Sequence, residues 1–146
     1  IHGAIQGLEG RIRALGGEEK ELCALPQVAE QTAATLALEL GDVSRFDRAR
    51  AVASYAGLVP RVMQSADTRH HGRLTKRGNR ELRWVLCQWA VRMLAKDPTV
   101  QTWAAPMLKR MSKNKVRVAL ARRLLMGVYV MRSRGEAFSL ERCLGR

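Results

Sequence analysis

The stretch NRELRWVLCQWAVRMLAKDP, residues 79–98, has the pattern of one long amphipathic helix. Its apolar residues recur at intervals of three and four, so they fall on one face of an α-helix. Asn79 is a preferred helix N-cap, and Asp97-Pro98 is typical of a helix end. This spacing predicts the central helix of the fold, whose inward face consists of Leu82, Val85, Leu86, Trp89, Ala90, Met93 and Leu94.

The residues on both sides of this stretch predict further helices and no sheet. One helix begins after a cap at Ser44 or Asp47 and ends at Ala56, and two more cover residues 99–111 and 113–133, before a short tail from Gly135. No run alternates apolar and polar residues as a half-buried strand does. The sequence therefore predicts an all-α, compact multi-helix domain.

Residues 18–40 have the outline of a helix-hairpin-helix, with short helices at 18–24 and 30–40 around a tight connection. In such a motif the hairpin amides and the N-terminus of the second helix face a phosphate, which the helix dipole favours. The connection contains no glycine, so its backbone is less free to approach DNA. A purely structural pair of helices is therefore the alternative interpretation.

Residues 1–17 are interpreted as an amphipathic spacer helix that precedes a helical domain of residues 18–146. Its apolar stripe fits either the end of a coiled coil or a helix packed on the core. Because the chain starts at Ile1 inside this pattern, we expect it to be part of a longer protein. The stripe consists of Ile5, Leu8, Ile12 and Leu15.

The formal net charge is +13, and the positive excess lies in the second half of the chain. Residues 1–60 have a net charge of −2, from 6 Lys and Arg against 8 Asp and Glu, whereas residues 61–146 have +15, from 20 against 5. Such an excess suits a polyanionic partner such as nucleic acid. A merely soluble basic face is the alternative, and a membrane partner fits less well, because the longest apolar run is far shorter than the roughly 20 residues of a spanning helix.

The three cysteines, Cys23, Cys87 and Cys143, are odd in number and lack metal-ligand spacing. The chain also shows no signal sequence. We therefore expect reduced thiols in a cytoplasmic protein.

Apolar periodicity disappears between residues 61 and 78, and an unpatterned stretch of this length inside a compact domain is typical of a functional loop. The stretch packs Arg, Lys and His residues around Ser65. It leads into the predicted helix at Asn79, where free amides, the helix dipole and the side chains of Arg80 and Arg83 can converge on one phosphate. This long basic loop suits phosphoryl transfer as well as phosphate binding.

Short motifs along the chain match those of one family. They are Leu25-Pro26, Thr32-Ala33, ELGD at residues 39–42, Arg45-Phe46, YAGLVP at 55–60, Gln64-Ser65, and GRLTKRGN at 72–79 followed by Leu82-Arg83. Over about residues 22–132 the chain resembles the C-terminal transposase domain of the serine-nucleophile, bridge-RNA-guided bacterial insertion-sequence transposases, which are related to the Piv-type DNA invertases. Two features depart from the family: Ala66 follows the serine where Gly is usual, and Gln27 and Ala29 stand where hairpin glycines are usual.

The resemblance implies that Ser65 attacks a DNA phosphodiester and forms a phosphoserine intermediate during recombination. It also implies a guide RNA, a homo-oligomeric synapse, and a separate N-terminal domain whose acidic residues hold a divalent metal such as Mg²⁺. On these residues themselves no metal or cofactor is expected. Basic and polar side chains around Ser65 would hold the nucleic acid and offset charge on the phosphate oxygens. The expected nucleic-acid contacts are Arg61, Gln64, Arg69, Arg73, Lys76, Arg77, Asn79, Arg80 and Arg83.

Several roles stay open at the level of sequence. The Ser65 proton could pass to Asp67 or to a histidine at 70 or 71, although these histidines also fit solvated loop residues or phosphate donors. Trp84 and Trp103 could stack on bases, whereas Trp89 lies on the inward face of its helix. The alternatives to a recombinase are a non-catalytic nucleic-acid-binding module and an assembly domain of a ribonucleoprotein. We expect these 146 residues alone to bind nucleic acid but to cut it poorly.

Overall fold

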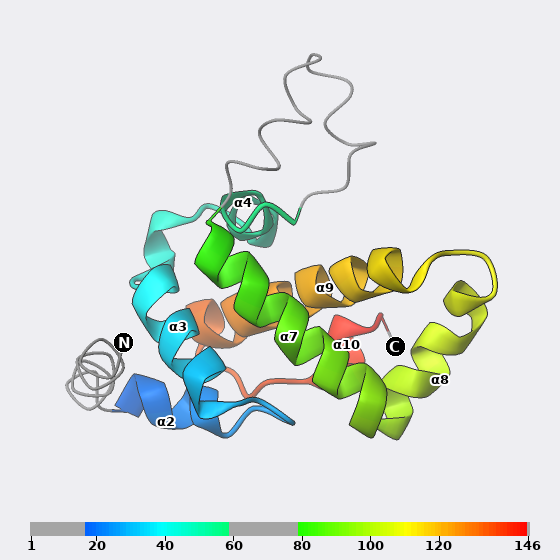
Figure 1. Ribbon diagram of the computed structural model, residues 1–146. Coiled ribbons are helices and arrows are strands. Elements are labelled where there is room, and N and C mark those ends of the chain that lie inside the picture. Colours follow the sequence, from blue (N-terminus) through cyan, green and yellow to red (C-terminus); the bar gives the residue numbers. More distant parts are fainter. Residues whose placement is uncertain (1–16, 59–78, 146) are drawn as a thin grey trace, which may run out of the picture.

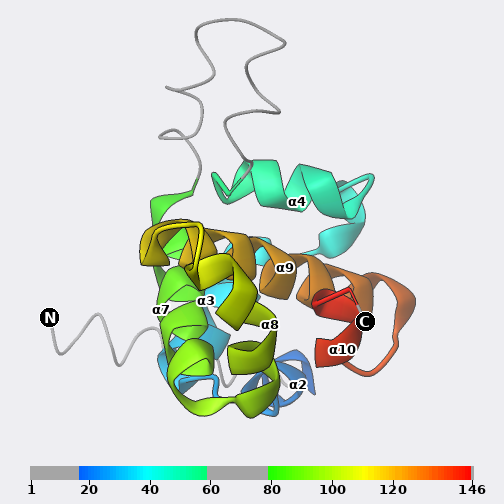
Figure 2. The ribbon, with the colours of Figure 1, turned by 90° about the vertical axis from the view of Figure 1, so that its right-hand side faces the viewer.

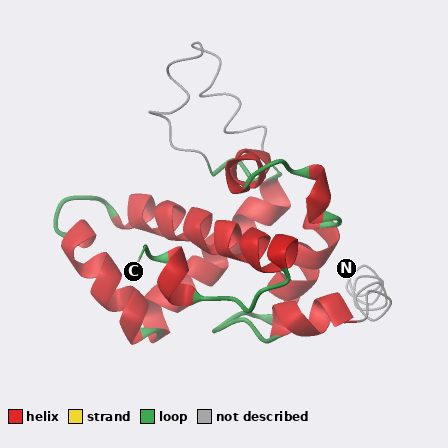
Figure 3. Ribbon diagram, turned by 180° about the vertical axis from the view of Figure 1, so that it is seen from behind, coloured by secondary structure: helices red, strands yellow, loops and turns green. Residues whose placement is uncertain are grey.

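The computed structural model describes residues 17–58 and 79–145, and the regular structure in these two ranges is entirely helical (Figure 3). The elements are α2 (Gly17–Cys23), α3 (Glu30–Leu40), the 3₁₀ turn η1 (Val43–Arg45), α4 (Ala49–Tyr55), α7 (Arg80–Lys96), α8 (Pro98–Leu108), α9 (Lys113–Arg134) and α10 (Leu140–Cys143). The predicted all-α, multi-helix fold is confirmed. Of the expected spacer helix, only Gly17 lies within the described residues, as the first residue of α2.

Helices α7 and α9 form the centre of the domain (Figures 1 and 2). Helix α3 packs beside α7, and α2 packs on α3. Helix α8 contacts both central helices, and α4 and α10 lie against α9. The predicted inward face of α7 is confirmed, since it is buried throughout except for the half-buried Leu94. Trp89 is fully buried, and its indole Nε1 donates to the Pro26 carbonyl over 2.8 Å, which satisfies its one polar atom inside the core.

Three predicted boundaries are wrong. Helix α8 ends at Leu108 and not at residue 111, because the chain turns at residues 109–110 before α9. Helix α4 does not begin at a cap on Ser44 or Asp47, because Ser44 lies in η1, where its backbone N–H donates to Asp42, and α4 starts only at Ala49. The expected tail from Gly135 contains α10, which Ser139 caps by accepting from the N–H of Arg142. Helix α10 has only four residues, which are too few to show the apolar periodicity that predicts a helix from sequence.

No helix in the described ranges is both long and apolar enough to cross a membrane.

Candidate functional site

The two described residues that flank positions 59–78, Leu58 and Asn79, are held beside the end of α4. Leu58 is buried in the core, and its N–H donates to the Ala53 carbonyl over 2.9 Å. The N–H of Asn79 donates to the Tyr55 carbonyl over 2.8 Å. The two described residues on either side of positions 59–78 are therefore both bonded to the last turn of α4, directly before α7.

Asn79 joins three helices at this place. Its Oδ1 accepts from the N–H of Leu82 over 3.0 Å, which makes it the N-cap of α7, as predicted. Its Nδ2 donates to Glu39 Oε2 over 2.6 Å and to the Tyr55 hydroxyl over 3.3 Å. Both amide hydrogens are thus bonded within the fold, so the side chain positions the start of α7. A contact between Asn79 and nucleic acid stays a prediction.

Arg45, the last residue of η1, contacts the end of α3 at the same junction. Its Nη2 donates to the carbonyls of Glu39 and Leu40 over 2.9 and 3.1 Å, which satisfies acceptors that the helix end leaves open. Its guanidinium lies 4.6 Å from the ring centroid of Phe46 and 4.8 Å from that of Tyr55. We call Glu39, Arg45, Tyr55 and Asn79 the anchor cluster.

The anchor cluster makes a stability prediction. We expect Asn79→Ala to lower the free energy of unfolding by about 1–3 kcal/mol, because it removes the cap and leaves the half-buried Glu39 without its amide donor. The exposed Asn114 in the first turn of α9 offers a matched control, and Asn114→Ala should change stability by less than about 0.5 kcal/mol. Urea denaturation measures both. Equal stability of the two variants would contradict the structural role of Asn79.

Beyond the anchor cluster, the first turns of α7 place basic and aromatic side chains next to the returning end of the loop. Arg80 is exposed, Arg83 is half-buried, and Trp84 is 58% exposed. Trp84 is therefore accessible to a base, whereas Trp103 is half-buried with the Arg123 guanidinium 5.6 Å from its ring centroid. Among the predicted site residues, only Asn79, Arg80 and Arg83 are described, and the structure brings them to one helix start.

The other predicted site residues lie outside the described ranges. They are the proposed nucleophile Ser65, the candidate proton acceptors Asp67, His70 and His71, and the expected contacts Arg61, Gln64, Arg69, Arg73, Lys76 and Arg77.

The α2–α3 connection has an unusual backbone at Gln27. Its φ of 55° lies in the left-handed region that favours glycine, and a hairpin glycine is what the family resemblance expected near this position. The turn thus keeps a glycine-like conformation with a side chain present, at a cost of about 1 kcal/mol. Binding of nucleic acid by this hairpin stays a prediction.

The charge asymmetry seen in the sequence is also present in the described part of the fold. Residues 17–58 contain 4 Lys and Arg against 7 Asp and Glu, whereas residues 80–145 contain 14 against 4. The positive excess therefore lies on α7, on α9 and at Lys109 and Arg110 between α8 and α9, and the sequence of the loop adds to it.

Comparison with known proteins assigns the chain to a family. Residues 19–104 match the model of the transposase IS116/IS110/IS902 family. The chain belongs to this family. The matched residues include the whole anchor cluster and the basic loop. No solved structure was found to match the chain.

Individual relatives include transposases and a DNA-inverting protein. The transposase for insertion sequence element IS1111A of Coxiella burnetii is 28% identical over 148 residues, covering 90% of this chain and 41% of the relative. The putative transposase y4rJ of Sinorhizobium fredii is 37% identical over 114 residues, covering 74% and 28%. The pilin gene-inverting protein of Moraxella bovis is 33% identical over 113 residues, covering 75% and 35%. The chain thus spans less than half the length of each of these relatives.

Sequence reasoning did not assign roles to Glu39, Arg45 and Tyr55. All three stand in motifs that carried the family resemblance, ELGD, Arg45-Phe46 and YAGLVP. Their contacts with Asn79 and with one another span up to 40 residues of sequence, so spacing alone does not reveal them.

Proposed function

We propose that this chain is the DNA-recombining domain of an insertion-sequence transposase, in which Ser65 attacks a DNA phosphodiester. The observation that supports this most is the anchor cluster, which holds Asn79, the described residue that follows the Ser65 segment, at the N-terminus of α7 beside the end of α4. Arg80 and Arg83 lie at that same helix start. The relatives named as transposases and as a pilin gene-inverting protein support DNA rearrangement as the biological role.

The proposed reaction conserves the energy of the phosphodiester. The Ser65 oxygen forms a bond to phosphorus, the bond from phosphorus to one deoxyribose oxygen breaks, and that oxygen takes up a proton. The proton lost by Ser65 passes to a base, with Asp67, His70 and His71 as candidates. A hydroxyl of a second strand then attacks the phosphoserine and releases Ser65, so no ATP is needed.

Positive charge would stabilise this exchange. Negative charge grows on the phosphate oxygens as phosphorus is attacked, and the positive end of the α7 dipole and nearby guanidinium groups favour it. The proposed contacts are Arg61, Gln64, Arg69, Arg73, Lys76, Arg77, Arg80 and Arg83.

The proposal includes partners outside these residues. Because the chain spans less than half of each relative, we infer a longer protein with an acidic N-terminal domain that holds a divalent metal such as Mg²⁺. Within residues 17–58 and 79–145 no three His, Cys, Asp or Glu side chains come together as a metal site. A guide RNA and a homo-oligomeric synapse complete the proposed assembly.

Trapping a covalent intermediate tests this function. We expect the full-length transposase, incubated with a DNA substrate nicked close to the exchange point, to accumulate a protein–DNA adduct stable to denaturant. After nuclease digestion, mass spectrometry should place the nucleotide on the peptide that contains Ser65. An adduct on another residue would remove the nucleophile assignment. Recombination without any adduct would favour a domain that only binds DNA.

A further inference from the structure

A pocket of about 410 Å³ opens between the start of α4, the C-terminal half of α9, and α10. It lies at the opposite end of α4 from the anchor cluster, because Ala49 lines it and Tyr55 belongs to the cluster. None of the described residues that line it is acidic, and four are arginines: Arg122, Arg123, Arg134 and Arg142. The function proposed above uses none of them.

Arg122 is the unusual member of this group. Its Nε is buried and has no hydrogen-bond partner within the described part of the chain. Burial lowers the pKa of its guanidinium, and the positive charges of Arg123 and Arg50 lower it further. A buried N–H donor without an acceptor is costly, and the neighbouring arginines add like charge beside it. A bound anion would provide that acceptor.

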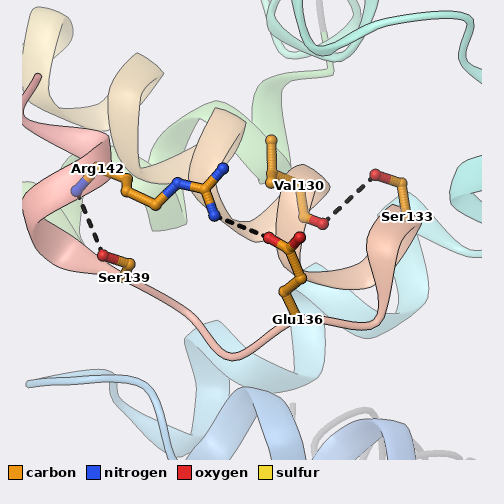
Figure 4. Close-up of polar contacts among 5 residues, drawn as sticks. All are labelled: Val130, Ser133, Glu136, Ser139 and Arg142. Carbon is orange, nitrogen blue, oxygen red and sulfur yellow. Dashed lines mark hydrogen bonds and ion pairs between the residues drawn. The ribbon is translucent and has the colours of Figure 1, made fainter.

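Two other arginines are held in place around Arg122. Arg123 Nη1 donates to the Cys143 carbonyl over 3.0 Å. Arg142 Nη1 lies 2.8 Å from Glu136 Oε2, and Figure 4 shows its side chain reaching from α10 to the connection that follows α9. Both guanidinium groups therefore already have one acceptor within the fold beside the pocket.

The wall between α9 and α10 is rigid as well. A Cβ on Gly127 would collide with Cys143 Sγ and lie 2.9 Å from Phe138, so α10 packs directly on the α9 backbone. Met126, Val130 and Ala137 add apolar surface beside the arginines. Guanidinium forks beside apolar walls suit a phosphate joined to a sugar better than a small free anion.

We infer that this pocket binds a phosphodiester group of a nucleic-acid backbone, as a contact separate from the Ser65 loop. The identification of the bound anion as a nucleic acid rests on the proposed function, whereas the arginines alone are the evidence that the pocket binds an anion. Helix α9 rises about 1.5 Å per residue, so Arg134 lies about 25 Å along its axis from Arg117. That length matches about seven nucleotides of one strand at 3.4 Å each. One strand of about that length can therefore span the distance along α9 between Arg117 and Arg134 at the pocket.

Paired substitutions in the full-length protein test the site. Arg134→Gln with Arg142→Gln removes two exposed pocket arginines, and Arg92→Gln with Arg110→Gln removes two exposed arginines elsewhere, so the charge change is matched. We expect the pocket pair to weaken binding of a fluorescent duplex DNA or single-stranded RNA about tenfold, and the control pair less than about threefold. If the pocket pair weakens binding of the duplex alone, the phosphate belongs to DNA. If it weakens binding of the RNA, the phosphate belongs to a guide RNA. Equal losses from both pairs would overturn the inference.

Arg122→Met provides an independent readout. We expect it to weaken nucleic-acid binding while leaving the melting temperature unchanged or raised, since it removes a buried N–H that has no acceptor among the described residues. Replacing chloride by inorganic phosphate at constant ionic strength should raise the melting temperature of the wild type more than that of the variant. If Arg122→Met binds nucleic acid as the wild type does and its melting temperature rises equally with phosphate, the proposed site is wrong. If Arg122→Met does not fold, the paired variants decide alone.

The same assays separate this inference from the nucleophile assignment. Ser65→Ala should bind nucleic acid and respond to phosphate as the wild type does, because it leaves the four pocket arginines unchanged. The prediction of phosphate binding in the pocket and the prediction of a Ser65 adduct can therefore be contradicted separately.

Discussion

Ser65→Ala is expected to reduce strand exchange by the full-length transposase by on the order of 10⁴-fold or more, because no other group can form the phosphoserine. Folding and DNA affinity should change little, since a single loop hydroxyl contributes little to either. Recombination between two plasmid-borne sites measures the first effect, and a melting curve with a binding titration measures the others.

Ser54→Ala is the matched control, because Ser54 is an exposed serine near the end of α4, outside the anchor cluster. It should recombine at the wild-type rate. Ser65→Cys separates chemistry from structure: a thiolate attacks a hard phosphorus centre poorly, so weak activity or a persistent adduct is expected. Wild-type recombination by Ser65→Ala would leave a binding module as the better description of the chain.

Periodic apolar patterns predicted the long elements of this fold correctly. The spacing of Leu82, Leu86, Trp89 and Met93 fixed the inward face of α7, and Asn79 marked its first turn. Helices α3 and α9 were likewise found within a residue of their ends. These segments bury one continuous face, so their sequence repeats with the helix period.

The short elements and the junction could not be derived in this way. Ser44 was expected to cap α4 but lies in the 3₁₀ turn η1. The Asp42 side chain caps that turn by accepting from the backbone N–H of Ser44. Helix α10 depends on a tertiary contact, the close approach of Cys143 to Gly127. The anchor cluster likewise exists only once α3, α4 and α7 have packed. Of the candidate site, sequence identified Asn79 as a cap but not its bond to Glu39.

The binding of nucleic acid should depend steeply on salt. A net charge of +15 on residues 61–146 is expected to be neutralised by phosphates, each of which releases counterions when it is bound. If about six phosphates are contacted, affinity for duplex DNA should fall on the order of 10³-fold between about 50 and 200 mM salt. Fluorescence anisotropy at several salt concentrations gives the slope of log affinity against log salt. A flat response would contradict an electrostatic interface.

The slope can also show which part of the chain makes these contacts. Arg73→Ala with Arg77→Ala removes two cations from the loop that the anchor cluster ties to α7, so the slope should become shallower by about two. Arg11→Ala with Arg13→Ala removes the same charge from the N-terminal stretch, where the surrounding sequence has no basic excess, and should leave the slope almost unchanged. Equal changes from both pairs would mean that only total charge matters. A change confined to the loop pair would locate the phosphate contacts beside Ser65, where the proposed reaction needs them.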